Sequence, residues 1–388
     1  MTEPIRILRI IARLNIGGPA IHVTLLTEKL GAPTYVSTLV CGNIEAGEGD
    51  MQYFAEKHGV TPRLLPELGR SLNPLRDLRT IWQLYKLMRE IRPQVVHTHT
   101  AKAGFVGRVA AKLAGVPVIV HTFHGHVFQG YFSPLKTQMF IVLERITARM
   151  SDTVITLTEG LRRELSEDYR ITRKSRITVL PLGLDLDAFA RVPRKAGDFR
   201  RAHGIAPDVP LIGIVGRLVP IKNHALFLQA ALKVRASIPN AVFAIIGDGE
   251  LRAELEAETA RLGLTDSVKF TGWVREVAPV YSDLDVLVIS SLNEGTPVSV
   301  IEALAARCPV VTTAVGGLPD LLDRGALGAL VPTEDVDALA AAITGAITDP
   351  PDTERAQRLM LDRYGIDRLV KDLDELYRGL LAKKGKLP

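Results

Sequence analysis

Two glutamates, Glu294 and Glu302, stand eight residues apart around the start of a predicted helix. The chain runs from an apolar strand, Asp285–Ile289, into a short loop, and Pro297 fits the first turn of a helix because its missing N–H costs nothing there. Free backbone amides at a helix start bind anions. Carboxylates on either side of a phosphate site suit the hydroxyl groups of a sugar nucleotide. A capped surface helix with two solvated acids explains the pair alone equally well.

A second loop carries two cations five residues apart, Arg217 and Lys222, directly after the predicted strand Leu211–Val215. Arginine can hold phosphate oxygens as a fork, and lysine can hold them as a point charge. Negative charge grows on a diphosphate as it leaves a sugar, and fixed cations stabilise that state. The loop therefore predicts a diphosphate clamp, with two plain exposed basic residues as the alternative.

Three further loops of the second half also follow predicted strands. The sequence Gly247-Asp248-Gly249 predicts a tight turn before a helix. Trp273 and Val274 offer an apolar wall and a backbone edge where a base could lie. The pair Gly316-Gly317 is placed to admit a ligand. Ligands of open parallel sheets bind outside the carboxyl ends of the strands, so we expect these loops to contribute to one site.

In the first half, Gly17 and Gly18 follow the first predicted strand and precede the helix Ala20–Leu30. Two glycines let the backbone approach a ligand, and the helix start behind them favours an anion. A tight turn alone is the other interpretation. The loop is not G-x-G-x-x-G, and G-x-x-x-x-G-K-[ST] occurs nowhere in the chain. Both a dinucleotide site and a P-loop are therefore disfavoured.

Histidines cluster at two predicted strand ends, His97–His99 and His121–His126. Zinc is disfavoured because no carboxylate or cysteine partner is obvious nearby, so we expect no metal. His124 ends a strand and precedes a glycine, so its ring can face a ligand and act on a sugar or its transition state. Polar side chains satisfied at the end of a sheet are the alternative.

Length and composition exclude several classes of protein. A chain of 388 residues with 47% hydrophobic and 23% charged residues suits two globular domains. The two cysteines, Cys41 and Cys308, lie far apart, which argues against a disulfide framework and favours a reducing cytoplasm. Charges interrupt the apolar N-terminal stretch, so we expect no signal peptide there, and no apolar run approaches a membrane span.

Positive charge is concentrated in the first half. Residues 1–190 hold 24 Lys and Arg against 17 Asp and Glu, or +7, whereas the remainder holds 24 against 26, or −2. The asymmetry favours an anionic partner such as a membrane surface, unless it is only a solvated surface. No basic run alternates with aromatic residues, so we expect no nucleic acid partner.

Strand and helix patterns alternate along the chain, which predicts two doubly wound parallel sheets. We expect an N-terminal domain over residues 1–190, a second domain over 191–365, and a C-terminal helix within 366–388 that crosses back to the first domain. A loose charged stretch, Arg191–His203, is the predicted linker.

Together these features resemble the retaining glycosyltransferases of the GT-B fold, the family often called group 1 or family four. The resemblance spans most of the chain, and the glutamate pair is its most specific part. Its motifs are Gly17-Gly18, His97–His99, Arg217 with Lys222, Gly247–Gly249, and Glu294 with Glu302. It implies an α/β fold of two Rossmann-like domains facing a central cleft, with no metal and no cofactor.

The resemblance also implies roles for single residues. Arg217 and Lys222 would hold the donor diphosphate, Glu294 the hydroxyls of the transferred sugar and Glu302 those of the ribose, while His124 would lie near the anomeric centre. The full set of expected donor-binding residues adds Gly17, Gly18, Gly247, Trp273, Val274, Gly295, Thr296, Pro297 and Val298. The family commonly has Phe-Gly where this chain has Thr296-Pro297, which leaves the donor sugar open.

The sequence thus predicts a retaining, metal-independent transferase that uses a UDP-sugar. The second domain would bind the donor and the first the acceptor, a polysaccharide precursor or lipid-linked sugar of the cell envelope. Two alternatives stay open: a non-hydrolysing sugar-nucleotide 2-epimerase, and a silent sugar-nucleotide-binding protein. The aromatic loop Phe128–Pro134 suggests contact with a lipid, so we expect a cytoplasmic protein peripheral to the inner face of the membrane.

Overall fold

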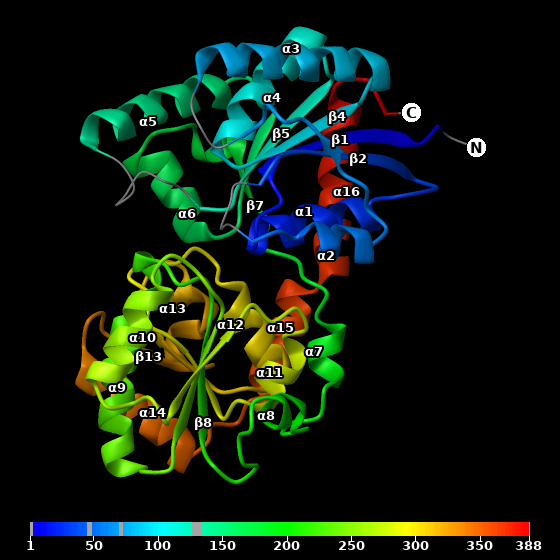
Figure 1. Cartoon of the computed structure of the whole chain (residues 1–388). Coiled ribbons are helices and arrows are strands. Elements are labelled where there is room, and N and C mark those ends of the chain that lie inside the picture. Colours follow the sequence, from blue (N-terminus) through cyan, green and yellow to red (C-terminus); the bar gives the residue numbers. More distant parts are fainter. Residues whose placement is uncertain (1–2, 45–48, 70–72, 126–132, 388) are drawn as a thin grey trace. The chain divides into compact units, whose positions relative to one another are not determined.

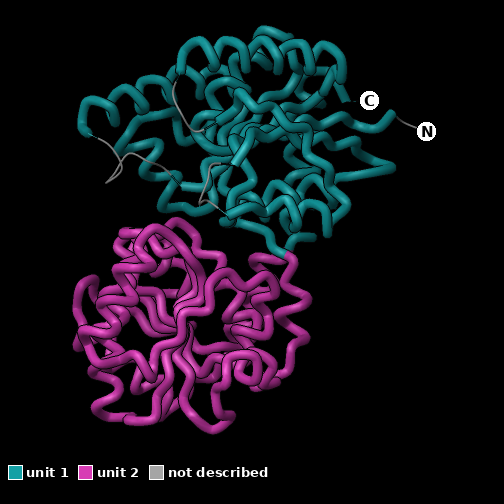
Figure 2. Tube along the Cα trace, in the orientation of Figure 1, with its two compact units in different colours: residues 1–184, 366–388 teal, residues 185–365 magenta. Residues whose placement is uncertain are grey.

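The computed structural model describes residues 3–44, 49–69, 73–125 and 133–387. The chain divides into two compact units (Figure 2). Unit 1 combines Met1–Leu184 with Ile366–Pro388, and unit 2 is Asp185–Gly365. Each unit is built around one parallel sheet, as the alternation of strand and helix patterns predicted.

Unit 1 contains a seven-stranded sheet in the order β3-β2-β1-β4-β5-β6-β7 (Figure 1). All of its strand pairs are parallel, and β1 lies between β2 and β4. The carboxyl ends of these strands therefore meet at one edge of the sheet, where His99 ends β4 and Phe123 ends β5. The strands are β1 (Ile5–Arg13), β2 (Tyr35–Gly42), β3 (Arg63–Leu64), β4 (Val95–His99), β5 (Val118–Phe123), β6 (Thr153–Thr156) and β7 (Ile177–Val179).

Helices cover both faces of this sheet. On one face, α4 packs between α3 and α5, and the core beneath α3 and α4 contains Leu8, Val96 and Ile119. On the other face, α1 and the C-terminal helix α16 bury Leu25, Leu373 and other apolar side chains. The helices of unit 1 are α1 (Gly18–Lys29), α2 (Gln52–Lys57), α3 (Pro74–Ile91), α4 (Ala101–Ala114), α5 (Pro134–Ala148), α6 (Glu159–Arg163) with the short turns Glu164–Asp168 and Lys174–Arg176, and α16 (Ile366–Lys383).

Unit 2 contains a six-stranded parallel sheet in the order β10-β9-β8-β11-β12-β13. Its strands are β8 (Leu211–Val215), β9 (Val242–Ile246), β10 (Val268–Gly272), β11 (Val286–Ile289), β12 (Val310–Thr313) and β13 (Ala329–Val331). Its helices are α7 (Asp187–Arg191), α8 (Asp198–Ala202), α9 (His224–Ser237), α10 (Arg252–Arg261), α11 (Ala278–Asp283), α12 (Val298–Ala305), α13 (Leu318–Leu321), α14 (Val336–Thr348) and α15 (Glu354–Tyr364), with short turns at Pro220–Lys222 and Asp323–Gly325. Strands β9 and β10 are added on one side of β8, and β11, β12 and β13 are added on its other side. The loops after the central strands β8 and β11 therefore diverge at the carboxyl edge, where doubly wound folds bind ligands.

The stretch Arg191–His203 is not the loose linker that its charges suggested. Arg200 is buried, and its guanidinium donates to Asp285 at 2.8 Å and to backbone carbonyls. The amide of Gly197 donates to Asp283 at 2.6 Å. Composition was misleading because Lys195 and Arg200 both pair with Asp285, which is distant in sequence. The stretch lies within unit 2.

Candidate active site

The loops at the carboxyl edge of the unit 2 sheet pack tightly on one another. Gly247 has a φ of 139°, and a Cβ atom there would lie 1.9 Å from the carbonyl oxygen of Gly216. Gly316 has a φ of 52°, and a Cβ there would lie 1.7 Å from the carbonyl oxygen of Glu294. Only glycine fits such contacts. The space at Gly316 is thus filled by the Glu294 backbone, rather than being left for a ligand as the sequence suggested.

Lys222 and Glu294, which lie 72 residues apart, form an ion pair of 2.6 Å in this site. The hydroxyl of Ser291 donates to the same oxygen, Glu294 Oε1, also at 2.6 Å. The carboxylate is nearly buried, so these two donors hold it in one place. Two of the residues predicted to act on a donor are therefore in direct contact, and the carboxylate at this loop is a fixed hydrogen-bond acceptor.

Arg217 lies on the same loop as Lys222, but its side chain is exposed. The Arg217 guanidinium makes no hydrogen bond or ion pair within the described part of the chain, so it is available to an anion. Thr296 lies beside Glu294, and its Oγ1 is buried without a hydrogen-bond partner among the described residues. Trp273, directly after β10, is 38% exposed. A bound ligand could satisfy all three side chains.

Helix α12 begins at Val298, with Pro297 as the residue before it, one position later than the sequence predicted. Gly295, Thr296 and Pro297 form the short turn from Glu294 to this helix start, where unpaired amides can bind an anion. The site residues thus surround a helix N-terminus, as expected for a phosphate ligand.

Glu302, within α12, is buried, and its Oε2 accepts a hydrogen bond of 3.0 Å from the hydroxyl of Tyr281. Burial raises the pKa of Glu302 to about 8, and the bond from Tyr281 offsets this only in part. Tyr281 is itself fully buried in α11. A carboxyl group held in this way can exist in either protonation state near neutral pH.

Glu302 should make the unfolding free energy depend on pH. Its folded pKa of about 8 lies above its ordinary value of 4.5, so the folded state favours the protonated form. The protonated Glu302 stabilises the folded state fully below pH 4.5, and this stabilisation is lost as the pH rises toward 8. Since one pKa unit corresponds to about 1.4 kcal/mol, the unfolding free energy should fall by a few kcal/mol over this range. The Glu302→Gln variant should lose this dependence. Urea unfolding of both proteins across this range measures it, and parallel profiles would contradict it.

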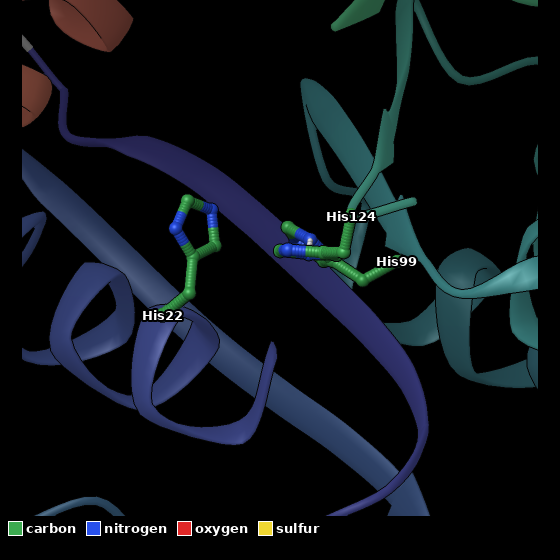
Figure 3. Close-up of side chains that lie close together, drawn as sticks. All are labelled: His22, His99 and His124. Atoms are coloured by element: carbon green, nitrogen blue, oxygen red, sulfur yellow. Dashed lines mark hydrogen bonds between the residues drawn. The ribbon is translucent and has the colours of Figure 1, made fainter. Parts of the chain in front are cut away.

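Gly17, Gly18 and His124, the site residues predicted in the first half of the chain, belong to unit 1. Gly17 precedes α1 with a φ of 154°, and Gly18 begins that helix. His22, one helical turn further along α1, has its imidazole close to those of His99 and His124 (Figure 3). The carboxyl ends of β4 and β5 and the start of α1 thus form a histidine cluster of three rings.

Within this cluster, Nδ1 of His99 and Nε2 of His124 are 3.1 Å apart, a hydrogen bond in which one ring donates and the other accepts. Burial lowers the pKa of His124 to about 4 and that of His99 well below its usual value. Both rings are therefore neutral at pH 7, and the hydrogen bond couples the tautomer of one ring to that of the other. The neighbouring His97 is also buried, and its Nδ1 forms a hydrogen bond of 2.6 Å with the hydroxyl of Tyr377 in α16.

The histidine cluster also has the composition of a metal site. One nitrogen from each of His22, His99 and His124 lies within 4.8 Å of the others. Zinc binds histidine nitrogens at about 2.0–2.1 Å, so His22 would have to move closer to share an ion with its neighbours. The expected absence of a metal remains a prediction, tested below.

Four residues of these sites were missed by the sequence analysis: His22, Ser291, Tyr281 and His99 as the partner of His124. His22 could have been found, because it lies four residues after Gly18 and therefore one turn along the same helix face. Ser291 and Tyr281 could not have been found in this way, because a single hydroxyl residue near a strand end or in a short helix does not by itself indicate a binding site.

The two halves of the chain match the profiles of known protein families. Residues 209–349 match the family described as "Glycosyl transferases group 1", and residues 17–183 match a "Glycosyl transferase 4-like domain". The chain belongs to the group 1 glycosyltransferases. One relative of this glycosyltransferase, the 2-deoxystreptamine N-acetyl-D-glucosaminyltransferase of Streptomyces fradiae, is 31% identical over 81% of this chain and 79% of its own.

A second relative of the glycosyltransferase is the UDP-Gal:alpha-D-GlcNAc-diphosphoundecaprenol alpha-1,3-galactosyltransferase of Escherichia coli. It is 29% identical, covering 82% of this chain and 84% of its own. Among solved structures, Anabaena HepE in complex with UDP and glucose has a TM-score of 0.81 at 20% identity, over 96% of this chain and 99% of HepE. Such neighbours confirm the predicted GT-B fold of two Rossmann-like domains.

Proposed function

We propose that this glycosyltransferase moves a sugar from a UDP-sugar to a hydroxyl of a lipid-linked sugar or polysaccharide precursor, with retention of the anomeric configuration. The observation that carries the proposal is the Lys222–Glu294 pair held beside the start of α12, with Arg217 exposed on the same loop. One carboxylate, two cations and a helix N-terminus suit the sugar and the diphosphate of such a donor.

In this proposal each group of the donor has its own partner. The diphosphate lies against the α12 amides, Arg217 and Lys222, with Thr296 Oγ1 donating to it or to the sugar. Glu294 accepts hydrogen bonds from sugar hydroxyls, Glu302 accepts them from the ribose, and Trp273 with Val274 forms a wall for the base. Gly247 lets its loop lie against the Gly216 backbone, so that backbone groups can contact the donor. In unit 1, Gly17 and Gly18 lie at the start of α1, where the backbone can approach a ligand.

The proposed reaction is a front-face displacement. The bond from the anomeric carbon to the diphosphate oxygen breaks, and the acceptor hydroxyl attacks on the same face while losing its proton to a leaving phosphate oxygen. Arg217 and Lys222 stabilise the negative charge that grows on the diphosphate. In unit 1, the neutral ring of His124, hydrogen-bonded to His99, can bind a hydroxyl of a sugar or an acceptor.

The relatives support this choice of substrates. The name of the Escherichia coli relative specifies UDP-Gal and a diphosphoundecaprenol-linked acceptor, and the Anabaena structure contains UDP and glucose. We propose a cytoplasmic protein that acts at the inner face of the membrane. None of the helices in the described ranges combines the length and hydrophobicity of a membrane span.

The donor class can be tested by protection against thermal unfolding. UDP and UDP-sugars should raise the Tm of the chain by more than GDP and GDP-sugars do at equal concentrations, because binding to the folded state stabilises it by mass action. Glu258→Gln, which alters an exposed ion pair on α10, is a control that should respond as the parent does. A larger shift with GDP-sugars would overturn the choice of nucleotide.

Transfer should not require a divalent metal. Arg217, Lys222 and the amides of α12 supply the positive charge that a metal would otherwise provide to the leaving diphosphate. An excess of EDTA should therefore change the transfer rate by less than twofold. Loss of transfer with EDTA and recovery with Mn²⁺ or Mg²⁺ would contradict this prediction. Recovery with Zn²⁺ that is abolished in His22→Ala would instead assign a metal to the histidine cluster.

A further inference from the structure

Exposed apolar side chains are concentrated on one helical layer of unit 1. Fourteen large hydrophobic side chains are exposed among the described residues, and eight of them lie on α3, α4 and α5. They are Leu75, Leu78 and Trp82 of α3, Leu113 of α4, and Leu135, Met139, Val142 and Ile146 of α5. Soluble proteins rarely gather such residues on one surface unless something covers them.

The solvent-facing side of α5 is apolar along its whole length. Leu135, Met139, Val142 and Ile146 follow one another at spacings of four, three and four residues, which places them on one stripe of the helix. Leu135 is 84% exposed. The opposite side of α5 packs on the sheet through Ile141 and Ala148. The helix therefore has two apolar faces, and only one of them has a partner within unit 1.

The exposed stripe on α3 combines apolar and basic side chains. Leu75 and Leu78 lie in its first two turns, and the Lys86 ammonium lies 5.2 Å from the centre of the Trp82 ring. Arg79 and Lys86 are both exposed. A helix with large apolar groups beside basic ones suits the boundary between water and an anionic lipid bilayer, where aromatic rings and cations are both favoured.

The acids of α3 and α5 do not oppose this positive charge. Asp77 pairs with Lys102 at 2.9 Å, Glu90 with Arg63 at 3.5 Å, and Glu144 with the buried Arg108 at 2.6 Å. Arg76 pairs with Glu67 at 3.9 Å, whereas the exposed cations Arg79, Lys86, Arg89 and Arg149 pair with no acid among the described residues. Charge complementarity therefore selects an anionic partner.

The topology places part of this surface at the same edge of the sheet as the histidine cluster. In a doubly wound sheet the helices run antiparallel to the strands, so α3 and α5 both begin at the carboxyl edge. Leu75, Leu78, Leu135 and Met139 lie in the first turns of these helices, at the edge where β4 and β5 end in His99 and Phe123. In Figure 1, α3, α4 and α5 cover the same face of the unit 1 sheet.

From these observations we infer that the outer surface of α3 and α5 docks this protein on an anionic lipid bilayer. The surface consists of Leu75, Leu78, Trp82, Leu135, Met139, Val142 and Ile146 with the cations Arg79, Lys86, Arg89 and Arg149. A second copy of the chain fits less well, because a two-fold dimer through this surface would bring two basic rims together. The inference extends the proposed membrane association to a defined surface, and it depends on that surface alone, not on the transfer reaction.

Co-sedimentation of the full chain with vesicles tests the inference. The parent should bind vesicles of phosphatidylcholine with phosphatidylglycerol, should bind pure phosphatidylcholine much less, and should be released by high salt. Leu135→Ser with Met139→Ser, and separately Arg79→Glu with Lys86→Glu, should each lower the bound fraction at least tenfold. Leu232→Ser, which changes a side chain of unit 2 that is as exposed as Met139, and Lys383→Glu on α16 are the matched controls and should bind as the parent does.

Equal binding of parent and surface variants, or equal binding to both lipid mixtures, would overturn the inference. Loss of a lipid-free dimer in the Leu135→Ser, Met139→Ser variant, measured by sedimentation velocity, would assign the surface to a second copy instead. Calorimetry with UDP separates this result from the proposed function: the surface variants should keep the parent's UDP affinity whether or not they bind vesicles.

Discussion

The Glu294→Gln variant should transfer sugar about a hundredfold more slowly than the parent. The amide oxygen of a glutamine can still accept hydrogen bonds from Lys222 and Ser291, so the loop should keep its conformation. The negative charge is lost, however, and with it an interaction that strengthens as positive charge develops on the sugar. A loss of about 3 kcal/mol in the transition state corresponds to this factor.

The Tm of the Glu294→Gln variant should remain within about 2 °C of the parent value, corresponding to a stability change below roughly 1 kcal/mol. The Glu258→Gln variant removes a glutamate of the same unit that pairs with Arg261 on the surface, and it should transfer at the parent rate. Transfer by Glu294→Gln within threefold of the parent rate would remove Glu294 from the catalytic residues.

Arg217→Ala and Lys222→Ala should each weaken UDP binding about tenfold, the usual value of a charged hydrogen bond. The double variant should lose less than the product of the two factors, because both side chains would contact one diphosphate. Lys222→Ala should also slow transfer more than Arg217→Ala does, since it leaves the nearly buried Glu294 without its cation.

Isothermal calorimetry with UDP measures these affinities directly. Lys233→Ala is a suitable control, because Lys233 is an exposed lysine of unit 2 that pairs with Asp337 away from the site. Unchanged UDP affinity in both single variants would remove the cation clamp from the account.

Much of the fold could be predicted from the sequence because its strands are short apolar runs between helical patterns. The predicted strand Leu211–Val215 coincides with β8, and the predicted strand Asp285–Ile289 matches β11 to within one residue. The two-residue strand β3 was not predicted, since two residues carry no periodic pattern. The path of Arg191–His203 could not be predicted either, because it depends on Asp283 and Asp285, acids that are distant in sequence.

The candidate site was predictable where a motif has a local cause. Arg217, Lys222 and Glu294 could be predicted because each lies on a loop that follows a strand. Lys222 and Glu294 come into contact because their loops follow the neighbouring strands β8 and β11. The pairing of Glu302 with Tyr281 depends on how α11 packs against α12, which a sequence does not reveal. The aromatic loop predicted to contact lipid falls mostly on residues 126–132, which lie outside the described residues.

The central claim, transfer of a sugar from a UDP-linked donor, is tested most directly by incubating the full chain with a panel of UDP-sugars and lipid-diphosphate sugar acceptors. Product structure and UDP release would be followed together by NMR. The account predicts UDP release that depends on the acceptor, and a product that keeps the anomeric configuration of the donor. A UDP-sugar epimerised at C2 without any acceptor, or donors that bind and are never turned over, would contradict it.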